Sequence, residues 1–301
     1  EKKIGTTGKG IGPAYADHVN RRSLKAYRLT DRKYLQKFLL DYIEMLKKRY
    51  NPDDDELNSI RKQEDDFLSA AKDISRMVED FSEELHQTLE KGENVLIEGA
   101  QGLLLDINFG TYPYVTSSST GSAGIMAGLP LSWNDINNVS GIFKAYTTRV
   151  GNGPFPTELF DTTGELLRDK GFEYGATTGR PRRCGWFDAV LAKYSIRLNG
   201  ISELIMTKID VLNDFEEIKV AVAYEIDGVK KSSAYGIMHR LDEVKPIYES
   251  FPGWQSDVSG IKKYMDLPQK LKNYVKFIED YTSASVRMIS TGVNREDVII
   301  R

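Results

Sequence analysis

Residues 94–301 contain short apolar runs that alternate with stretches of helical periodicity, and this alternation constrains the fold more than any other feature. Each run has the length of a strand, and several end in glycine or a polar turn, as a buried strand feeding a loop does. Strands that alternate with helices are typical of a largely parallel sheet flanked by helices. We therefore predict an α/β fold for residues 94–301. The predicted strands are residues 95–99, 141–149, 203–208, 219–226 and 286–290, and the helical patterns are Trp186, Val190, Tyr194, Leu198 and Leu271, Tyr274, Phe277, Ile278, Tyr281.

Residues 1–93 differ, because a glycine-rich loop is followed by two apolar stripes at helical spacing. We interpret the stripes as two amphipathic helices. The Asp-rich residues 51–65 between them predict an exposed connection. We expect the two portions to form one structural domain overall. The stripes are Tyr34, Phe38, Tyr42, Ile43, Leu46 and Phe67, Ala71, Ile74, Val78, Phe81, Leu85.

Charge and cysteine usage exclude several classes of protein. The formal net charge is −3, from 41 Lys and Arg against 44 Asp and Glu, so no basic field favours nucleic acid as a partner. Cys184 is the only cysteine, which rules out an intrachain disulfide and favours a reduced, cytoplasmic setting with a buried or neutral thiol. No apolar run reaches the roughly 18 residues of a membrane span. Because the sequence begins at Glu1 rather than Met, we expect it to be part of a longer chain.

The opening segment GTTGKGIGPAY has four glycines within eight residues, with two threonine hydroxyls between them. Such a loop can bring backbone N–H groups against a phosphate. Lys9 is not followed by Ser or Thr and the spacing differs from GxxxxGK[ST], so we reject a conventional P-loop here. A plain glycine-rich loop remains the alternative.

A carboxylate and an amide follow the first predicted strand in EGAQG, and a row of hydroxyls follows in YPYVTSSSTGSAG, residues 112–124. The Gln101 amide can donate and accept, which suits a purine edge or a ribose, and the Thr116 hydroxyl can donate to phosphate. Either residue can equally be a turn residue whose polar groups are satisfied locally.

Three arginines crowd together in ATTGRPRRCGW, residues 176–186. Guanidiniums at Arg180, Arg182 and Arg183 repel one another unless anions compensate them, and Arg binds carboxylate and phosphate bidentately. The segment therefore predicts an anion site, with a solvated basic loop as the alternative.

The motif TKID, residues 207–210, directly follows a predicted strand. The Asp210 carboxylate can accept two hydrogen bonds from guanine, and the Lys208 stem can cover the ring face, whereas adenine lacks that donor pair. STG, residues 290–292, also follows a strand and can place backbone groups around the same base. His18, His86 and His239 lie far apart, without carboxylates or cysteines at metal-ligand spacing, so we predict no metal site built by this chain.

Taken in order, these motifs resemble adenylosuccinate synthetase over essentially the whole chain. The departures are Lys9 where that family often has Arg, Leu103 where Thr is frequent, and Asn108 with Phe109 where Asp-His is frequent. None of them removes a position used above. The matching segments are GTTGKGIGPAY, EGAQGLLLDINFGTYPYVTSS, KAYTTRVGNGPFPTE, GATTGRPRRCGWFD, TKIDVL, PIYESFPGW and ISTG.

The resemblance implies a P-loop-NTPase-like α/β fold and a GTP-dependent ligation of IMP and aspartate, in which a 6-phosphoryl-IMP intermediate forms first. It also implies magnesium as cofactor and a cytoplasmic homodimer in which Arg21 reaches the IMP phosphate of the neighbouring subunit. The implied IMP site is Thr7, Arg21, Gln101, Thr116 and Arg180. The implied aspartate loop is Ala176, Thr177, Thr178, Gly179, Arg180, Pro181 and Arg182. The implied GTP site is Arg182, Lys208, Ile209, Asp210, Ser290, Thr291 and Gly292.

Members of the resembled family also carry a glycine-rich QWGDEGKG loop, with a catalytic Asp that binds magnesium, and a catalytic His further on. Neither is in these 301 residues, and His18 does not replace the histidine. We therefore assign no catalytic residue here, expect the magnesium ligands elsewhere, and expect this chain alone to be inactive. The alternative is a non-catalytic nucleotide-binding or scaffold fragment.

Overall fold

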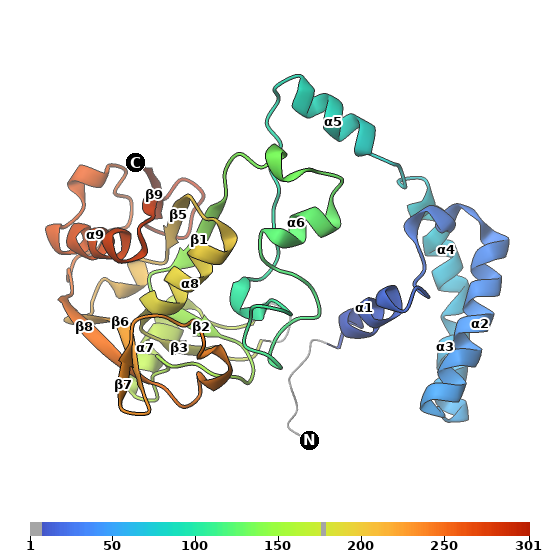
Figure 1. Cartoon of the computed structure of the whole chain (residues 1–301), viewed down its shortest axis with the longest axis horizontal. Helices are drawn as coiled ribbons and strands as arrows, with labels where there is room; N and C mark the ends of the chain where they lie inside the picture. The colour runs from blue at the N-terminus through green and yellow to red at the C-terminus, as the bar shows by residue number, and fades with distance from the viewer. Residues whose placement is uncertain (1–7, 176–178) are drawn as a thin grey trace. The chain divides into compact units, whose positions relative to one another are not determined.

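The computed structural model describes residues 8–175 and 179–301, which fall into two compact units (Figure 1). A helical unit spans residues 10–97, and an α/β unit comprises residues 8–9, 98–175 and 179–301. The prediction of a single structural domain stays a prediction. In the part of the chain that the structure describes, no helix combines the length and apolar character that a membrane span requires.

The helical unit packs around a small apolar core formed by Leu35, Leu68 and Ala71. Its second helix, α2, confirms the stripe predicted from Tyr34 to Leu46. The Tyr42 hydroxyl on α2 donates to Asp17 on α1 at 2.5 Å, which ties the two helices together. The elements are α1 (Ile11–Val19), the 3-10 turn η1 (Ala26–Thr30), α2 (Arg32–Tyr50), α3 (Asp54–Lys62), α4 (Glu64–Ser75) and α5 (Ser82–Glu90).

Two predictions for this unit were wrong in detail. The stripe from Phe67 to Leu85 forms two helices, α4 and α5, with a break between them. Residues 51–65 are mostly exposed as predicted, but they contain α3 rather than an irregular connection. The reason is a capping box: Asp53 Oδ1 accepts from the Glu56 N–H at 2.8 Å, and Glu56 Oε2 accepts from the Asp53 N–H at 3.2 Å. The Asp-rich start that indicated a loop therefore begins a helix.

The main sheet of the α/β unit has the order β1-β5-β9-β10. Strands β1 (Ser140–Lys144), β5 (Glu203–Thr207) and β9 (Ser285–Ser290) pair in parallel, and β10 (Val298–Ile300) pairs antiparallel with β9. This confirms the predicted parallel sheet and the strands at residues 203–208 and 286–290. Residues 141–149 form two strands instead of one, because β2 (Thr147–Arg149) leaves the sheet to pair with β3 (Arg183–Gly185).

A second sheet is built on β6 (Glu217–Ile226). It pairs in parallel with β4 (Phe187–Asp188) and antiparallel with β7 (Val229–Lys231) and β8 (Lys245–Pro252). The strand predicted at residues 219–226 is therefore confirmed, although it does not join the parallel sheet. The strand predicted at residues 95–99 was wrong: it pairs with no strand of the described chain, and Leu96 is 93 % exposed. An apolar run without a neighbouring strand gains neither ladder hydrogen bonds nor burial.

Helices connect and cover these strands. The two helical patterns of the sequence are confirmed in α8 (Ala189–Asn199) and α9 (Gln269–Thr282), although Trp186 lies before α8 and was wrongly assigned to it. The remaining helices are α6 (Ala123–Gly128) and α7 (Thr162–Gly171). The 3-10 turns are η2 (Leu103–Leu105), η3 (Trp133–Asp135), η4 (Asp210–Leu212), η5 (Met238–Arg240) and η6 (Tyr264–Asp266).

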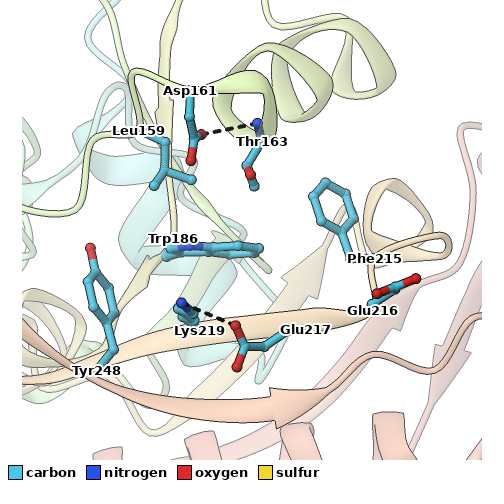
Figure 2. Close-up of a pocket in the computed structure, with 9 residues that line it drawn as sticks. All are labelled: Leu159, Asp161, Thr163, Trp186, Phe215, Glu216, Glu217, Lys219 and Tyr248. Carbon is cyan, nitrogen blue, oxygen red and sulfur yellow. Dashed lines mark hydrogen bonds and ion pairs between the residues drawn. The ribbon is translucent and has the colours of Figure 1, made fainter.

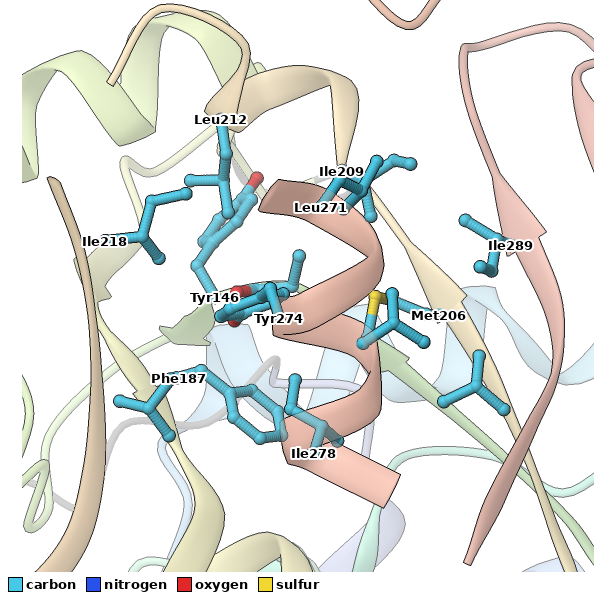
Figure 3. Packing of buried hydrophobic residues seen from close by; sticks show 14 of the residues in the cluster. Tyr146, Phe187, Met206, Ile209, Leu212, Ile218, Leu271, Tyr274, Ile278 and Ile289 are labelled. Atoms are coloured by element: carbon cyan, nitrogen blue, oxygen red, sulfur yellow. Dashed lines mark hydrogen bonds between the residues drawn. The ribbon is translucent and has the colours of Figure 1, made fainter. Parts of the chain in front are cut away.

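Helix α9 lies in the main core of the α/β unit, where it buries Leu271, Tyr274 and Ile278 (Figure 3). Figure 3 shows Ile218 of β6 on one side of this helix and Ile289 of β9 on the other. The Tyr274 hydroxyl donates to the Ala145 carbonyl at 2.7 Å, so the helix is tied to the end of β1 across 129 residues of sequence.

Cys184 is fully buried in the same core, and burial raises the pKa of its thiol to about 11. The prediction of a buried or neutral thiol is therefore confirmed. A group of this kind packs as a small apolar side chain.

Asp188 begins α8 as a fully buried N-cap: its carboxylate accepts from the Leu191 N–H at 3.0 Å and from the Tyr224 hydroxyl at 2.6 Å. Burial raises its pKa to about 6. The native state then holds this proton more tightly than the unfolded chain, so the contribution of Asp188 to stability falls as pH rises from about 4 to about 6.

We predict that Asp188→Asn removes this loss, because Asn caps a helix as well as Asp and carries no charge. The free energy of unfolding of the variant relative to the unaltered protein should rise by about 2–3 kcal/mol between pH 4 and pH 7. Urea unfolding across this pH range measures it. Asp161→Asn, at the exposed N-cap of α7, is the matched control. A flat difference at Asp188 would contradict the prediction.

Candidate functional site

The carboxyl ends of two neighbouring parallel strands bring two predicted motifs together. Met206 of β5 pairs with Ile289 of β9, so both strands end at the same edge of the sheet. Residues 207–210 complete and follow β5, and residues 290–292 complete and follow β9. Ligands of open α/β sheets bind beyond this edge.

Asp210 follows β5 with an acceptor that the fold does not use. Its Oδ1 is buried and has no hydrogen-bond partner among the described residues, a condition it shares there only with Thr157 Oγ1. Leaving such an acceptor unpaired costs about 1–3 kcal/mol. Ile209 beside it is fully buried and anchors the turn η4 in the core. The turn therefore holds a carboxylate with one buried oxygen that no described residue engages.

Lys208 and Gln101 have left-handed backbones, with φ of 64° and 63°. Most other described non-glycine residues with positive φ end a helix or form a hairpin turn, whereas these two follow no helix. Non-glycine residues in such conformations cost roughly 1–3 kcal/mol and cluster at functional sites. Lys208 Nζ donates to the Gly171 carbonyl at 3.1 Å, and Gln101 is exposed.

The segment after β9 folds back tightly on itself. Ser290 Oγ donates to the Gly292 carbonyl at 2.9 Å, and the buried Thr291 N–H donates to the Asp297 carbonyl at 2.8 Å. A Cβ at position 292 would lie 2.6 Å from Asp297 Oδ2, so a larger residue would displace the carboxylate that accepts from Asn294 and Lys262. This loop is held in one conformation at the same sheet edge as Asp210.

Residues 106–121, which include Thr116, are organised by the buried Asp106. Its carboxylate accepts from the backbone N–H groups of Asn108 (2.8 Å), Phe109 (3.1 Å), Thr120 (2.6 Å) and Gly121 (3.3 Å). Burial opposes ionisation, but these four hydrogen bonds outweigh it and lower the pKa of Asp106. The Thr116 N–H donates to the Leu105 carbonyl at 2.9 Å, which closes the loop.

Arg149 supports the same loop from β2. Its Nη2 donates to Thr111 Oγ1 at 2.9 Å and to the Tyr114 carbonyl at 3.1 Å. Burial lowers its pKa to about 10. Sequence reasoning missed both Asp106 and Arg149, since nothing in their spacing distinguishes them from surface charges.

The arginine cluster is compensated within the fold to a degree that the sequence argument did not foresee. Arg182 Nη1 donates to Glu173 Oε2 at 2.6 Å, and Arg183 forms a bidentate pair with Glu158. The charges of Arg182 and Arg183 are therefore compensated by carboxylates of the fold and do not by themselves require a bound anion, and the anion site stays a prediction. The feature is instead two arginines oriented by carboxylates, next to the exposed Gly179, Arg180 and Pro181.

Glu173 is the centre of a buried polar cluster that sequence reasoning also missed. It is 1 % exposed and accepts from Lys144 Nζ at 2.8 Å and from the Tyr146 hydroxyl at 2.5 Å, besides Arg182. Burial alone would raise the pKa of Glu173, but the hydrogen bonds from Lys144, Tyr146 and Arg182 lower it. The only sign of this cluster in the sequence is one acidic residue, Glu173, nine residues before Arg182.

Some predicted residues lie elsewhere. Thr7, Ala176, Thr177 and Thr178 fall outside the described residues. Arg21 belongs to the helical unit, where it is exposed directly after α1 with φ of 58°. Among the described residues, no group of three His, Cys, Asp or Glu side chains is placed to hold a metal ion.

A cavity of about 360 Å³ is lined by none of the residues predicted to bind IMP, aspartate or GTP (Figure 2). Figure 2 shows Trp186 in its middle, with Asp161 accepting from the Thr163 N–H and Lys219 paired with Glu217. These charges already serve a helix cap and an ion pair, so we assign the cavity no ligand. Its lining is Leu159, Asp161, Thr163, Trp186, Phe215, Glu216, Glu217, Lys219 and Tyr248.

Comparison with known proteins gives one consistent result. The family model of adenylosuccinate synthetase matches residues 1–299. Adenylosuccinate synthetases of Leifsonia xyli and Alcanivorax borkumensis are 45 % and 48 % identical to this chain over its whole length, which spans 69 % and 70 % of theirs. The structure of fully ligated adenylosuccinate synthetase from Plasmodium falciparum superposes with a TM-score of 0.94 at 37 % identity, covering 100 % of this chain and 71 % of that one.

We predict that Asp106→Asn loosens residues 120–121 selectively. If the amide keeps Oδ1 as an acceptor for Asn108 and Phe109, its NH₂ group faces the N–H groups of Thr120 and Gly121, a mismatch worth about 1–3 kcal/mol. Hydrogen exchange resolved by residue should show about tenfold or greater loss of protection at Thr120 and Gly121. Amides of β6 serve as the internal control. Unchanged protection at both residues would show that Asp106 does not hold the loop.

Proposed function

Because the chain belongs to the adenylosuccinate synthetase family, we propose that it takes part in the GTP-dependent ligation of IMP and L-aspartate to adenylosuccinate. In this reaction the γ-phosphoryl group of GTP passes to O6 of IMP. The aspartate amine then attacks C6 and releases phosphate, leaving GDP and adenylosuccinate. An amide-like oxygen is a poor leaving group, and phosphorylation makes it a good one. The role of the binding groups is to orient the reactants and to meet the anionic charge that migrates.

The unpaired Asp210 Oδ1 is the observation that carries the GTP assignment. A buried carboxylate oxygen without a donor fits a ligand that brings donors, and the guanine base presents an N2 amino group next to N1–H. Lys208, Ile209 and the segment Ser290, Thr291 and Gly292 lie at the same sheet edge and complete the proposed guanine site. Arg182 is assigned to both GTP and aspartate.

The IMP and aspartate sites are proposed from the resemblance together with the rigidity of the loops. Gln101 and Thr116 belong to loops near Asp106 and are assigned to IMP, with Arg180 and with Thr7, which lies outside the described residues. The aspartate loop is residues 176–182, of which Gly179 to Arg182 are described. Arg21, exposed after α1, is assigned to the IMP of the neighbouring subunit of a homodimer.

Magnesium is the cofactor that the proposed reaction implies, where it would neutralise phosphate charge. The described residues do not fit a site built by three or more protein ligands, so we assign no ligand to it in this chain. A cytoplasmic location completes the proposal, since the single buried thiol suits a reduced compartment.

We predict that Asp210→Asn weakens GTP and relaxes the preference for guanine, because one acceptor becomes a donor that faces the donors of the base. The kcat/KM for GTP should fall by a factor that corresponds to about 1–3 kcal/mol. The fall should be smaller for ITP, which lacks the amino group. Steady-state kinetics of the complete gene product measure both. Asp214→Asn, whose side chain is 69 % exposed, is the matched control. An unchanged GTP KM and nucleotide preference would refute the guanine site.

We also predict that the 301-residue chain, purified alone, forms no adenylosuccinate, whereas the complete gene product does. The resemblance places the catalytic Asp and His in segments that these residues do not contain, and such groups are worth factors of about 100 or more each. An assay with GTP, IMP, aspartate and magnesium measures both proteins. Product formation by the 301-residue chain would overturn this prediction, and its absence from the complete product would overturn the proposed function.

A further inference from the structure

The buried Glu173 cluster joins three segments that lead to the proposed site. Lys144 ends β1, and Arg182 ends the proposed aspartate loop. Glu173 follows α7, directly after the left-handed Phe172 that caps this helix. The carboxylate of Glu173 is therefore the point at which the sheet edge and the loop are connected.

The backbone reinforces this connection. The Arg182 N–H donates to the Glu173 carbonyl at 2.8 Å, and the Gly175 N–H donates to the Arg180 carbonyl at 2.8 Å. Residues 174 and 181 form an antiparallel bridge between them. The base of the loop is thus clamped by main-chain bonds, and the side chain of Glu173 extends the clamp to the Arg182 guanidinium.

The hydrogen bonds of Lys144 and Arg182 differ in an informative way. All three donors of the Lys144 ammonium are accounted for by Thr148 Oγ1 at 2.9 Å and both Glu173 oxygens at 2.8 Å. Arg182 gives only Nη1 to Glu173, and its remaining guanidinium nitrogens have no hydrogen-bond partner among the described residues. Lys144 is thereby a support, whereas Arg182 keeps donors for a ligand.

Charge balance points the same way. Glu173 supplies one negative charge to two cations, and the nearby Lys208 ammonium donates only to the Gly171 carbonyl within the described chain. With the Asp210 carboxylate at the same edge, Glu173 and Asp210 offset two of the three positive charges of Lys144, Arg182 and Lys208, so one positive charge remains. Substrates with carboxylates or phosphates supply the missing counter-charge.

We propose that Glu173 is a positioning residue: it holds the Arg182 guanidinium in the orientation that binds the anionic groups of aspartate and GTP, while Lys144 and Tyr146 hold Glu173 in place. This role rests on the proposed function. Glu173 itself is 1 % exposed and touches no substrate in this assignment. Its effect on the reaction passes through Arg182.

The test is a double-mutant cycle in the complete gene product with Glu173→Gln and Arg182→Gln. Glu173→Gln should raise the KM for aspartate and GTP about tenfold or more, since a charge-assisted hydrogen bond orients the guanidinium. The KM for IMP should stay within about twofold. In the Arg182→Gln background the second change should alter the aspartate KM by less than about twofold, because the group it positions is gone.

A matched control and a second variant keep the outcome decisive. Glu279→Gln removes the carboxylate that pairs with Arg301 at 2.7 Å, a partly buried Arg–Glu pair outside the proposed site, and should leave all three KM values unchanged. If Glu173→Gln does not fold by circular dichroism, Glu173→Asp, which keeps the charge but withdraws it by one methylene, should give the same pattern of KM values.

Two results would overturn the proposal, and they are distinguishable. Normal turnover of the unaltered protein with additive effects of the two changes, or with equal effects on all three KM values, means that Glu173 only stabilises the fold. Failure of the unaltered complete protein to form adenylosuccinate removes the proposed function and this role together.

Discussion

Parallel pairing of β1, β5 and β9 is the constraint on which the rest of the α/β unit depends. Parallel strands need long crossover connections, and their carboxyl ends meet at one edge. The crossover from β1 to β5 carries α7, Glu173, the proposed aspartate loop, β4 and α8, and the one from β5 to β9 carries β6, β7, β8 and α9. The sheet order thus places residues 207–210 and 290–292 at neighbouring strand ends. The first crossover also carries the buried Glu173, whose carboxylate pairs with Arg182.

Electrostatic balance within the fold then decides which charged groups remain available. Arg183 uses four of its five N–H donors on Glu158 and two backbone carbonyls, and Lys144 uses all three of its donors on Glu173 and Thr148. Their charges contribute to the architecture. Within the described residues, the Arg182 guanidinium donates only to Glu173 and the Lys208 ammonium only to the Gly171 carbonyl, so each has further N–H donors that the described chain does not use. Within the basic segment, Arg183 therefore supports the fold, whereas Arg182 keeps donors that can bind a substrate.

The sequence predicted elements wherever burial is one-sided or complete, and it failed where partners far along the chain decide. Helices α8 and α9 and strands β5, β6 and β9 carry clear apolar patterns. Strand β8 was missed because its partly buried pattern shows no alternation, and the run at residues 95–99 was wrongly predicted because no described strand pairs with it. TKID and STG lie at strand ends as predicted, whereas EGAQG follows no strand of the described chain. Asp106 and Glu173 act through distant contacts that spacing does not reveal.

Counting donors separates the carboxylates that the fold satisfies from Asp210, which it leaves with an unpaired oxygen. Asp106 receives four backbone N–H groups, Glu173 receives two cations and a hydroxyl, and Asp188 receives an amide and a phenol. Asp210 keeps a buried oxygen with no donor. Since an unpaired buried acceptor costs about 1–3 kcal/mol, the fold alone gives no reason to keep it there. A ligand that brings two adjacent N–H donors would recover that cost on binding, which is why Asp210, rather than the more conspicuous arginines, is the stronger indication of a guanine nucleotide.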